Sequence, residues 1–155
     1  QQIWQELPQR PGPHPVDFVV VTALRDTLYL IGGMQKHVDW TSSTVSSIQR
    51  FDTLNNQWET LRPMMQARFH AIAATTQGLI YVFGGLYANS WSKQYYLSSL
   101  ACFDPVSNTW QNASPMPFPI ERGTSIITFG HALLCFWKNP ETFERSNPSY
   151  ICFII

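Results

Sequence analysis

Two apolar segments, each ending in a pair of glycines, constrain the fold of this chain more than any other feature. The first is LYLIGG at residues 28–33, and the second is LIYVFGG at residues 79–85. Neither segment shows the alternation of a half-exposed strand, so both are typical of strands buried on two faces. The glycines that follow indicate a position where another stretch of backbone approaches closely.

The two segments belong to a longer internal repeat with a constant spacing. Four markers recur 52 residues apart: Gly32-Gly33 with Gly84-Gly85, Tyr29 with Tyr81, Phe51-Asp52 with Phe103-Asp104, and Trp58 with Trp110. Unrelated coincidences would not share one spacing. A period of about 50 residues with several short strands per unit is typical of a β-propeller blade. We expect the Tyr and Trp rings to fill the space toward the rim, each with a polar atom that reaches a backbone acceptor.

These markers resemble the repeat of the kelch family. The resemblance rests on the double glycine, the tyrosine before it, the aromatic-Asp pair and the tryptophan. The aromatic-Asp pair and the tryptophan lie within FDTLNNQW (51–58) in the first repeat, and the second repeat ends in DPVSNTW (104–110). It covers residues 18–116 well and both ends poorly. It implies an all-β fold, a kelch-type β-propeller present in part, with about three blades of four antiparallel strands.

The repeat divides the chain into a leading strand and three blades. Because IWQELP resembles QWETLRP of the first repeat, residues 1–8 are predicted to form the outer strand of a preceding blade. We expect blade one at 16–64, blade two at 65–117, and a degenerate or truncated blade three at 118–155. In blade three Lys138-Asn139 replace the glycine pair. A capping repeat would have a polar outer face, whereas this chain ends in ICFII, so we expect a truncated chain. Its tail at 138–155 need not be native.

This number of blades does not close a ring, since propellers usually have about four to eight. An open blade face would expose apolar side chains worth on the order of 8 kcal/mol, which is comparable with the whole stability of an ordinary domain. We therefore expect further blades to cover the open faces. They would come from the rest of a longer chain or from a second copy.

Two long segments between the second and third strands of their blades, residues 34–47 and 86–98, are expected to be loops with a function. Their candidate partner-binding residues are Lys36, Trp40, Tyr87 and Trp91. The aromatic rings of the second segment either fold back over the blade edge or face a partner, and the sequence leaves both interpretations open.

The kelch resemblance adds two arginines to the candidate site. In kelch proteins partners dock on the face formed by the connections between blades and the loops after the glycine pair, where arginines at the start of the inner strand are frequent contacts. This selects Arg68 and Arg122, whereas blade one has Val16 at the corresponding position. A solvated loop arginine is an equally good interpretation of both.

Composition and motifs exclude several classes of function. Ten basic and ten acidic residues give zero net charge, and no basic run exceeds a pair, so we expect neither a nucleic acid nor a membrane surface as partner. There is no motif for a metal, a cofactor or a catalytic residue, and we expect none of them. The three cysteines, Cys102, Cys135 and Cys152, lie in apolar strand patterns, which favours reduced core cysteines and a cytoplasmic protein.

The sequence therefore predicts a non-enzymatic protein-protein interaction module. The segments PMMQARFHA (63–71) and PMPFPIERG (115–123) are similar to those of BTB-kelch proteins, which implies the substrate-recognition part of an adaptor for a cullin ubiquitin ligase. One alternative is a kelch scaffold that binds actin or the cytoskeleton. Another is a propeller enzyme whose catalytic residues lie in further blades.

Overall fold

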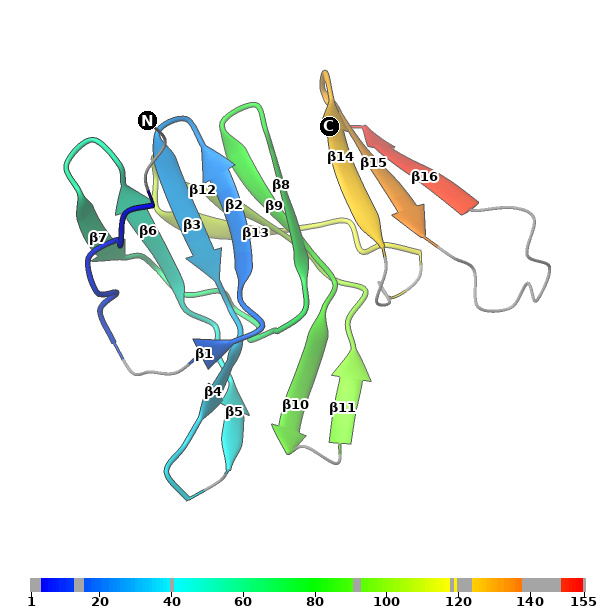
Figure 1. The fold of residues 1–155 in the computed structure, drawn as a ribbon. Helices are drawn as coiled ribbons and strands as arrows, with labels where there is room; N and C mark the ends of the chain where they lie inside the picture. The colour runs from blue at the N-terminus through cyan, green and yellow to red at the C-terminus, as the bar shows by residue number, and fades with distance from the viewer. Residues whose placement is uncertain are drawn as a thin grey trace.

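The computed structural model describes residues 4–12, 16–39, 41–90, 93–117, 119, 124–137 and 149–154. Within these ranges the chain forms β-strands and connections and contains no helix. Three antiparallel sheets stand side by side, with their inner strands adjacent to one another (Figure 1). The fold is all-β and is that of an unclosed part of a β-propeller, as the sequence predicted.

Blade one is a four-stranded antiparallel sheet in the order β2-β3-β6-β7. Its strands are Val20–Leu24 (β2), Thr27–Ile31 (β3), Ile48–Asp52 (β6) and Gln57–Thr60 (β7). The apolar segment before the glycine pair is therefore a central strand, flanked on both sides.

Blade two repeats this arrangement in the order β8-β9-β12-β13. Its strands are Ile72–Thr76 (β8), Leu79–Phe83 (β9), Leu100–Asp104 (β12) and Thr109–Ala113 (β13). The pair Phe51↔Trp58 of blade one corresponds to Phe103↔Trp110 of blade two. The spacing of 52 residues in the sequence is thus also a correspondence of strand register.

Blade three shows three strands among the described residues, in the order β14-β15-β16. They are Ser125–Phe129 (β14), Ala132–Trp137 (β15) and Ser149–Ile154 (β16). The hydroxyl of Thr128 donates a hydrogen bond to the carbonyl oxygen of Thr75 at 3.0 Å, which joins β14 to the inner strand of blade two. The Lys138-Asn139 replacement lies outside the described residues.

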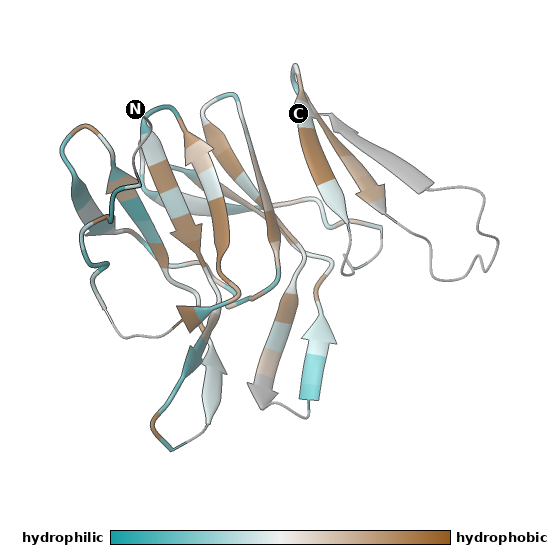
Figure 2. Ribbon diagram, viewed as in Figure 1, coloured by the Kyte–Doolittle hydropathy of each residue, from teal (hydrophilic) through white to brown (hydrophobic). Residues whose placement is uncertain are grey.

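Two apolar layers hold the blades together, and Figure 2 shows the hydrophobic residues running along their central strands. Between blades one and two, Tyr29 and Ile31 pack with Ile80 and Val82. Between blades two and three, the core consists of Ala74, Tyr81, Phe83, Leu100, Leu133 and Cys135. The outward side chains of the terminal blades, such as Val21 and Phe129, are exposed, so the described sheets leave two open faces.

The predicted outer strand at residues 1–8 is wrong for its described part, since residues 4–10 form no strand. No described strand pairs with this segment, so its backbone joins no ladder.

The leading segment nevertheless makes the same tryptophan contact as the equivalent segment of blade one. Trp58 Nε1 donates to the carbonyl oxygen of Pro8 at 2.8 Å, and Trp110 Nε1 donates to the carbonyl oxygen of Arg62 at 2.7 Å. Each acceptor follows the previous tryptophan by four residues, Trp4 in the first case. Both bonds confirm that the ring nitrogens reach backbone acceptors.

The two segments expected to be loops form β-hairpins instead, and both extend from the same end of the blades (Figure 1). The first consists of β4 (Met34–Lys36) and β5 (Ser42–Thr44), with β1 (Val16–Asp17) paired to β4. The second consists of β10 (Leu86–Ser90) and β11 (Lys93–Tyr96). Apolar residues at their bases, among them Met34 and Leu86, form a small buried cluster, which gives the hairpins a core of their own.

The glycine pairs are required by close approach of backbone, as the sequence indicated. Gly85 has a φ of +90°, and a Cβ built there would lie 2.8 Å from the carbonyl oxygen of Phe69 and 2.9 Å from the Cβ of Ala71. Gly33 has a φ of +112°, and its Cβ would lie 2.8 Å from the carbonyl oxygen of Asp17. In both blades the entry segment crosses directly over the glycine.

A comparison of Gly85→Ala with Gly78→Ala tests this role. Gly78 has a φ of +79° but open space around its missing Cβ, so its substitution costs only the backbone strain of about 1–2 kcal/mol. We expect Gly85→Ala to cost about 2 kcal/mol more, because the added methyl group also collides with backbone. Urea unfolding of both variants measures the difference. Equal losses would show that close approach is not the constraint.

Candidate functional site

The two hairpins come from different blades and form one continuous surface, which we call the hairpin surface (described residues 34–39, 41–44, 86–90 and 93–96). The Thr44 hydroxyl joins them by two hydrogen bonds, in addition to the shared apolar cluster. Thr44 Oγ1 on β5 donates to the carbonyl oxygen of Ala88 on β10 at 2.8 Å and accepts from the Ala88 amide at 3.0 Å. The two hairpins also have the same strand register. The pair Met34↔Thr44 in the first hairpin corresponds to the pair Leu86↔Tyr96 in the second, 52 residues further on. A partner can therefore contact both hairpins as one platform.

Three tyrosines of the second hairpin present their rings at this surface. Tyr87, Tyr95 and Tyr96 are 36%, 42% and 52% exposed, so these rings are not buried against the blade edge. The ammonium group of Lys93 lies 5.6 Å from the centre of the Tyr95 ring. Tyrosine is enriched in protein interfaces because a large apolar ring ends in a polar group. The hairpin surface therefore carries exposed aromatic rings that end in polar groups.

The predicted site residues fall into three groups in the structure. Lys36 and Tyr87 lie on the hairpin surface, and Lys36 Nζ is 2.6 Å from Asp17 Oδ2 in an exposed ion pair. Exposed pairs contribute little to stability, so Lys36 can exchange this partner for another. Trp40, Trp91 and Arg122 lie outside the described residues. Arg68 forms the third group by itself.

The prediction of Arg68 as a partner contact is wrong, because its side chain is 2% exposed. Nη1 donates to the carbonyl oxygens of Gly84 at 2.9 Å and Ser99 at 3.2 Å, and Nη2 donates to Ser99 Oγ at 3.0 Å. Burial lowers the pKa of the guanidinium to about 10, which leaves it charged at neutral pH. Arg68 therefore ties the entry of blade two to its second and third strands.

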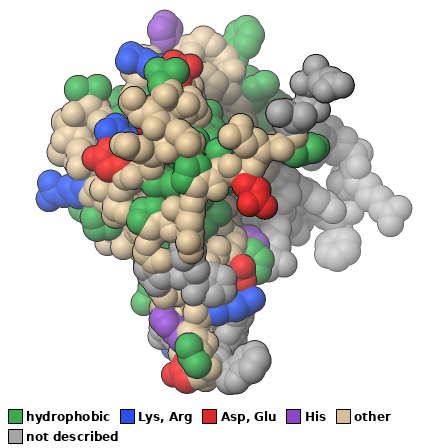
Figure 3. Space-filling model, turned by 60° about the vertical axis from the view of Figure 1, so that its left-hand side comes forward, with side chains coloured by type: hydrophobic (Ala, Val, Ile, Leu, Met, Phe, Trp, Pro, Cys, Tyr) green, Lys and Arg blue, Asp and Glu red, His purple; other side chains and the backbone are tan. Residues whose placement is uncertain are grey.

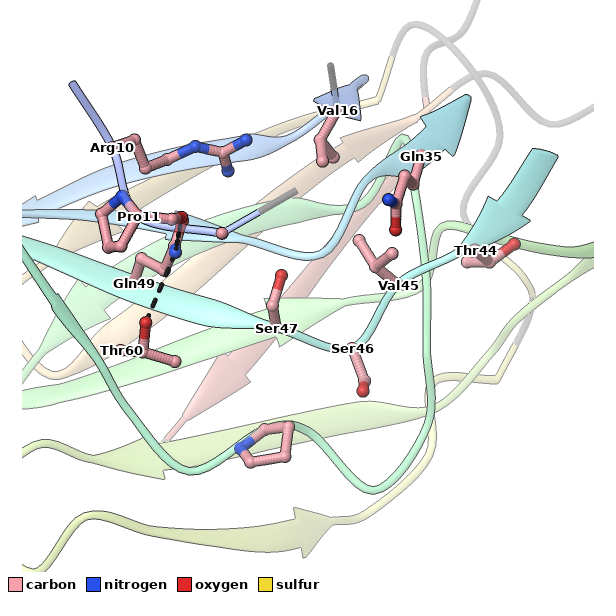
Figure 4. A pocket seen from close by; sticks show the side chains of 12 residues that line it. Arg10, Pro11, Val16, Gln35, Thr44, Val45, Ser46, Ser47, Gln49 and Thr60 are labelled. Carbon is pink, nitrogen blue, oxygen red and sulfur yellow. Dashed lines mark hydrogen bonds between the residues drawn. The ribbon is translucent and has the colours of Figure 1, made fainter. Parts of the chain in front are cut away.

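A pocket of about 420 Å³ opens beside the first hairpin and was not indicated by any motif. Figure 4 shows side chains converging on it from the leading segment, from β1, β4, β5, β6 and β7, and from the connection between β5 and β6. Its polar lining includes Arg10, Gln35, Ser47, Gln49 and Thr60. Val16, which stands in blade one where blade two has Arg68, also lines this pocket.

Gln49 is the buried polar residue of this pocket, at 6% exposure. Its Nε2 donates to the carbonyl oxygen of Pro11 at 2.6 Å and reaches Thr60 Oγ1 at 3.4 Å. Its Oε1 is buried and accepts no hydrogen bond. The register, which pairs Val21 with Leu30 and Leu30 with Gln49, places Gln49 on the open face of blade one.

The described residues contain no cluster of three or more His, Cys, Asp or Glu residues that could hold a metal ion. The carboxylates of Asp52 and Asp104 hold turns, because they accept hydrogen bonds from the amides of Leu54 and Val106 at 2.9 Å and 2.8 Å. Hydrogen bonds from the side chains of Asn55 and Ser107, together with these backbone bonds, lower the pKa of the Asp52 and Asp104 carboxyls. Charged groups are scattered over the face seen in Figure 3. The described chain also lacks an apolar helix long enough to span a membrane.

Radial four-stranded antiparallel sheets with a glycine pair after the second strand define a kelch-type β-propeller. The chain is similar in fold to a solved structure titled "Structure of YjhT", with a TM-score of 0.73 and 18% identity over 86% of this chain and 47% of that one. The KLHDC2/KLHL20/DRC7 Kelch-repeats domain model matches residues 1–136. The chain belongs to this Kelch-repeat family.

Curated relatives carry the same kind of repeat in longer chains. Kelch-like protein 36 of Mus musculus is 28% identical over 123 residues, which cover 74% of this chain and 18% of that protein. Kelch-like protein 23 of Homo sapiens is 32% identical over 106 residues, which cover 68% of this chain and 17% of that protein. The chain thus spans less than a fifth of the length of these relatives.

The structural role of Arg68 is testable by substitution. We expect Arg68→Met to lower the free energy of unfolding by about 3 kcal/mol, because it keeps the apolar stem and leaves buried carbonyl acceptors without a donor. The matched control is Arg62→Met at an exposed position, which should change stability by less than about 0.5 kcal/mol. Chemical unfolding of both variants gives the values. A stable Arg68→Met variant with reduced partner binding would restore Arg68 as a contact residue.

Proposed function

We propose that this chain is a non-enzymatic protein-interaction module whose partner binds the hairpin surface. The observation that carries the proposal is the platform itself, in which the Thr44 hydroxyl joins hairpins of two blades and Tyr87, Tyr95 and Tyr96 are exposed. Tyr87 and Tyr95 are cross-strand partners in the second hairpin, and tyrosines on a fixed backbone give contact area at a low cost in side-chain entropy. Exposed Lys36 adds a charged group at the same end of the blades.

The finer proposal is that the module recognises substrates for a cullin ubiquitin ligase, as part of a BTB-kelch adaptor in the cytoplasm. Membership of the Kelch-repeat family and similarity to Kelch-like proteins 36 and 23 support it. The free thiols of Cys102 and Cys135 are compatible with a reducing compartment. The BTB part of such an adaptor would belong to a longer chain that contains these 155 residues.

We also propose that further blades cover the two open faces. Exposed Val21 on blade one, and Ile127 and Phe129 on blade three, are the side chains that a neighbouring blade would bury. The greater length of the relatives supports a source within a longer chain, and a second copy is the other source.

Partner capture with hairpin variants tests the interaction surface. The test variant replaces Tyr87, Tyr95 and Tyr96 by serine, and the control replaces the still more exposed Leu54 and Val106 by serine in the turns at the other end of the blades. We expect the tyrosine variant to lose at least about tenfold in affinity for captured partners, since central interface rings contribute about 2 kcal/mol or more each. The control should bind as the unmodified chain does. Equal binding by both variants would reject the hairpin surface.

The adaptor role has its own readout. If captured partners are ligase substrates, their cellular levels should rise at least about twofold when cullin activation is inhibited, and their ubiquitylation should fall. Partners that bind through the tyrosines but keep the same level and ubiquitylation would reject the adaptor role and leave the interaction module intact.

A further inference from the structure

The outer edge of β11 is a strand edge that no described strand uses. Figure 1 shows β10 between β5 and β11, so β11 forms the outer edge of the second hairpin. The described residues give this hairpin two strands only, and all four residues of β11 are exposed. Blade two is packed between blades one and three, so this edge lies on neither of the two open faces.

The ladder between β10 and β11 determines which backbone groups point outward. Leu86 exchanges two backbone hydrogen bonds with the entry segment of blade two, and both backbone groups of Ala88 bind the Thr44 hydroxyl. Leu86 and Ala88 thus direct their amides and carbonyls away from β11. In an antiparallel pair, the residues opposite them direct theirs away as well. Those residues are Tyr96 and Gln94, so two amides and two carbonyls point outward from β11.

The opposite edge of the hairpin shows how such groups are satisfied in this fold. At β10 the backbone of Phe69 and the hydroxyl of Thr44 supply the donors and acceptors. Blade two has Tyr96 in the place of Thr44, 52 residues further on. The side chain of Tyr96 is 52% exposed, so it is not buried by a following hairpin. The joint between the two hairpins is therefore not repeated at β11.

We propose that the protein partner contributes an extended segment that adds a strand to the outer edge of β11. The inference rests on the proposed interaction function and states how the partner binds the hairpin surface. An edge with unpaired amides and carbonyls is a template for pairing with another chain. In strand addition the main-chain hydrogen bonds provide affinity, and the side chains beside them provide specificity. Here the main-chain groups are those of Gln94 and Tyr96.

Tyr95 indicates which side chain the added segment carries. It lies between the two residues whose groups point outward, so an antiparallel segment places one residue in a non-hydrogen-bonded pair with it. Tyr87 is paired with Tyr95 on its other side and continues the same row. Aromatic rings pair favourably with β-branched or aromatic residues across strands. The segment should therefore carry a β-branched or aromatic residue opposite Tyr95.

The direct experiment measures amide hydrogen exchange of the full chain by NMR, with and without the peptide acetyl-Thr-Val-Thr-Val-Thr-Lys-amide. At saturating peptide we expect exchange at Gln94 and Tyr96 to slow at least tenfold. The Tyr95 amide faces β10 by the same alternation, so it serves as the internal control and should not change. The matched probe is the same peptide with N-methylated backbone amides, which keeps the side chains, removes the donors and should bind at least tenfold more weakly.

Three results would overturn the proposal. One is equal binding of the two peptides, or no saturable effect of either. Another is protection of the Gln94 and Tyr96 amides in the free chain that is unchanged by dilution, because this chain itself would then cover the edge. The third is protection that rises with the concentration of the chain alone, which would show a second copy at the edge.

Two substitutions at one position locate the pairing to this edge. Gln94→Pro removes an outward amide and places ring carbons in the path of the added strand, but that amide takes no part in the ladder with β10. Gln94→Ala keeps the amide and is the control. We expect Gln94→Pro to weaken peptide binding at least tenfold and Gln94→Ala to bind as the unmodified chain does. Unchanged exchange at Tyr95 shows that the proline variant keeps its hairpin.

These variants also separate the inference from the proposed function. Equal peptide binding by Gln94→Pro and Gln94→Ala would refute strand addition. If both variants also bind captured partners equally while the tyrosine variant loses them, the interaction function stands and strand addition does not.

Discussion

The close approach between the glycine pair of each blade and the neighbouring backbone is the constraint on which the rest of this structure depends. Gly33 donates its amide to the carbonyl oxygen of Arg68 at 2.8 Å, so the end of a central strand in blade one is bonded to the entry of blade two. A side chain at either glycine would separate these segments. Because both hairpins begin directly after the glycines, the same contact fixes the hairpin surface in space.

The strands of the repeat could be predicted because their pattern is local. Central strands are apolar runs, and the segments at residues 28–33 and 79–85 contain most of β3 and the whole of β9. The hairpins could not be predicted in this way. Their polar sequences lack alternation, and the Thr44–Ala88 hydrogen bonds join residues 44 positions apart. The leading segment failed for a different reason, since residue pattern predicts a strand but its partner strand decides whether the ladder forms.

For Arg68, the role implied by the kelch resemblance differs from the environment of the side chain in the structure. The sequence placed it at the start of an inner strand, where the kelch resemblance implied a contact. Its acceptors, Gly84 and Ser99, lie 16 and 31 residues further along the chain, so no local pattern reveals its burial. Once buried, the guanidinium must be hydrogen-bonded, because a buried charge without partners would cost several kcal/mol. Arg68 therefore serves to hold the fold together.

In a protein with an internal repeat, equivalent positions of two blades can be compared to separate residues that the fold requires from residues that it leaves free to vary. The glycine pairs, Tyr29 with Tyr81, and Trp58 with Trp110 recur because each blade needs the same close approach and the same rim contacts. Residues of the candidate site are among those that do not recur: Val16 against Arg68, Gln35 against Tyr87, Thr44 against Tyr96, and Gln49 against Ala101. These changes are carried by one backbone frame, so they are not explained by differences in fold. Arg68 and Thr44 hold the structure, so selection for a particular partner can act most freely where Gln35 of the first hairpin is replaced by Tyr87 in the second, at one end of the blades.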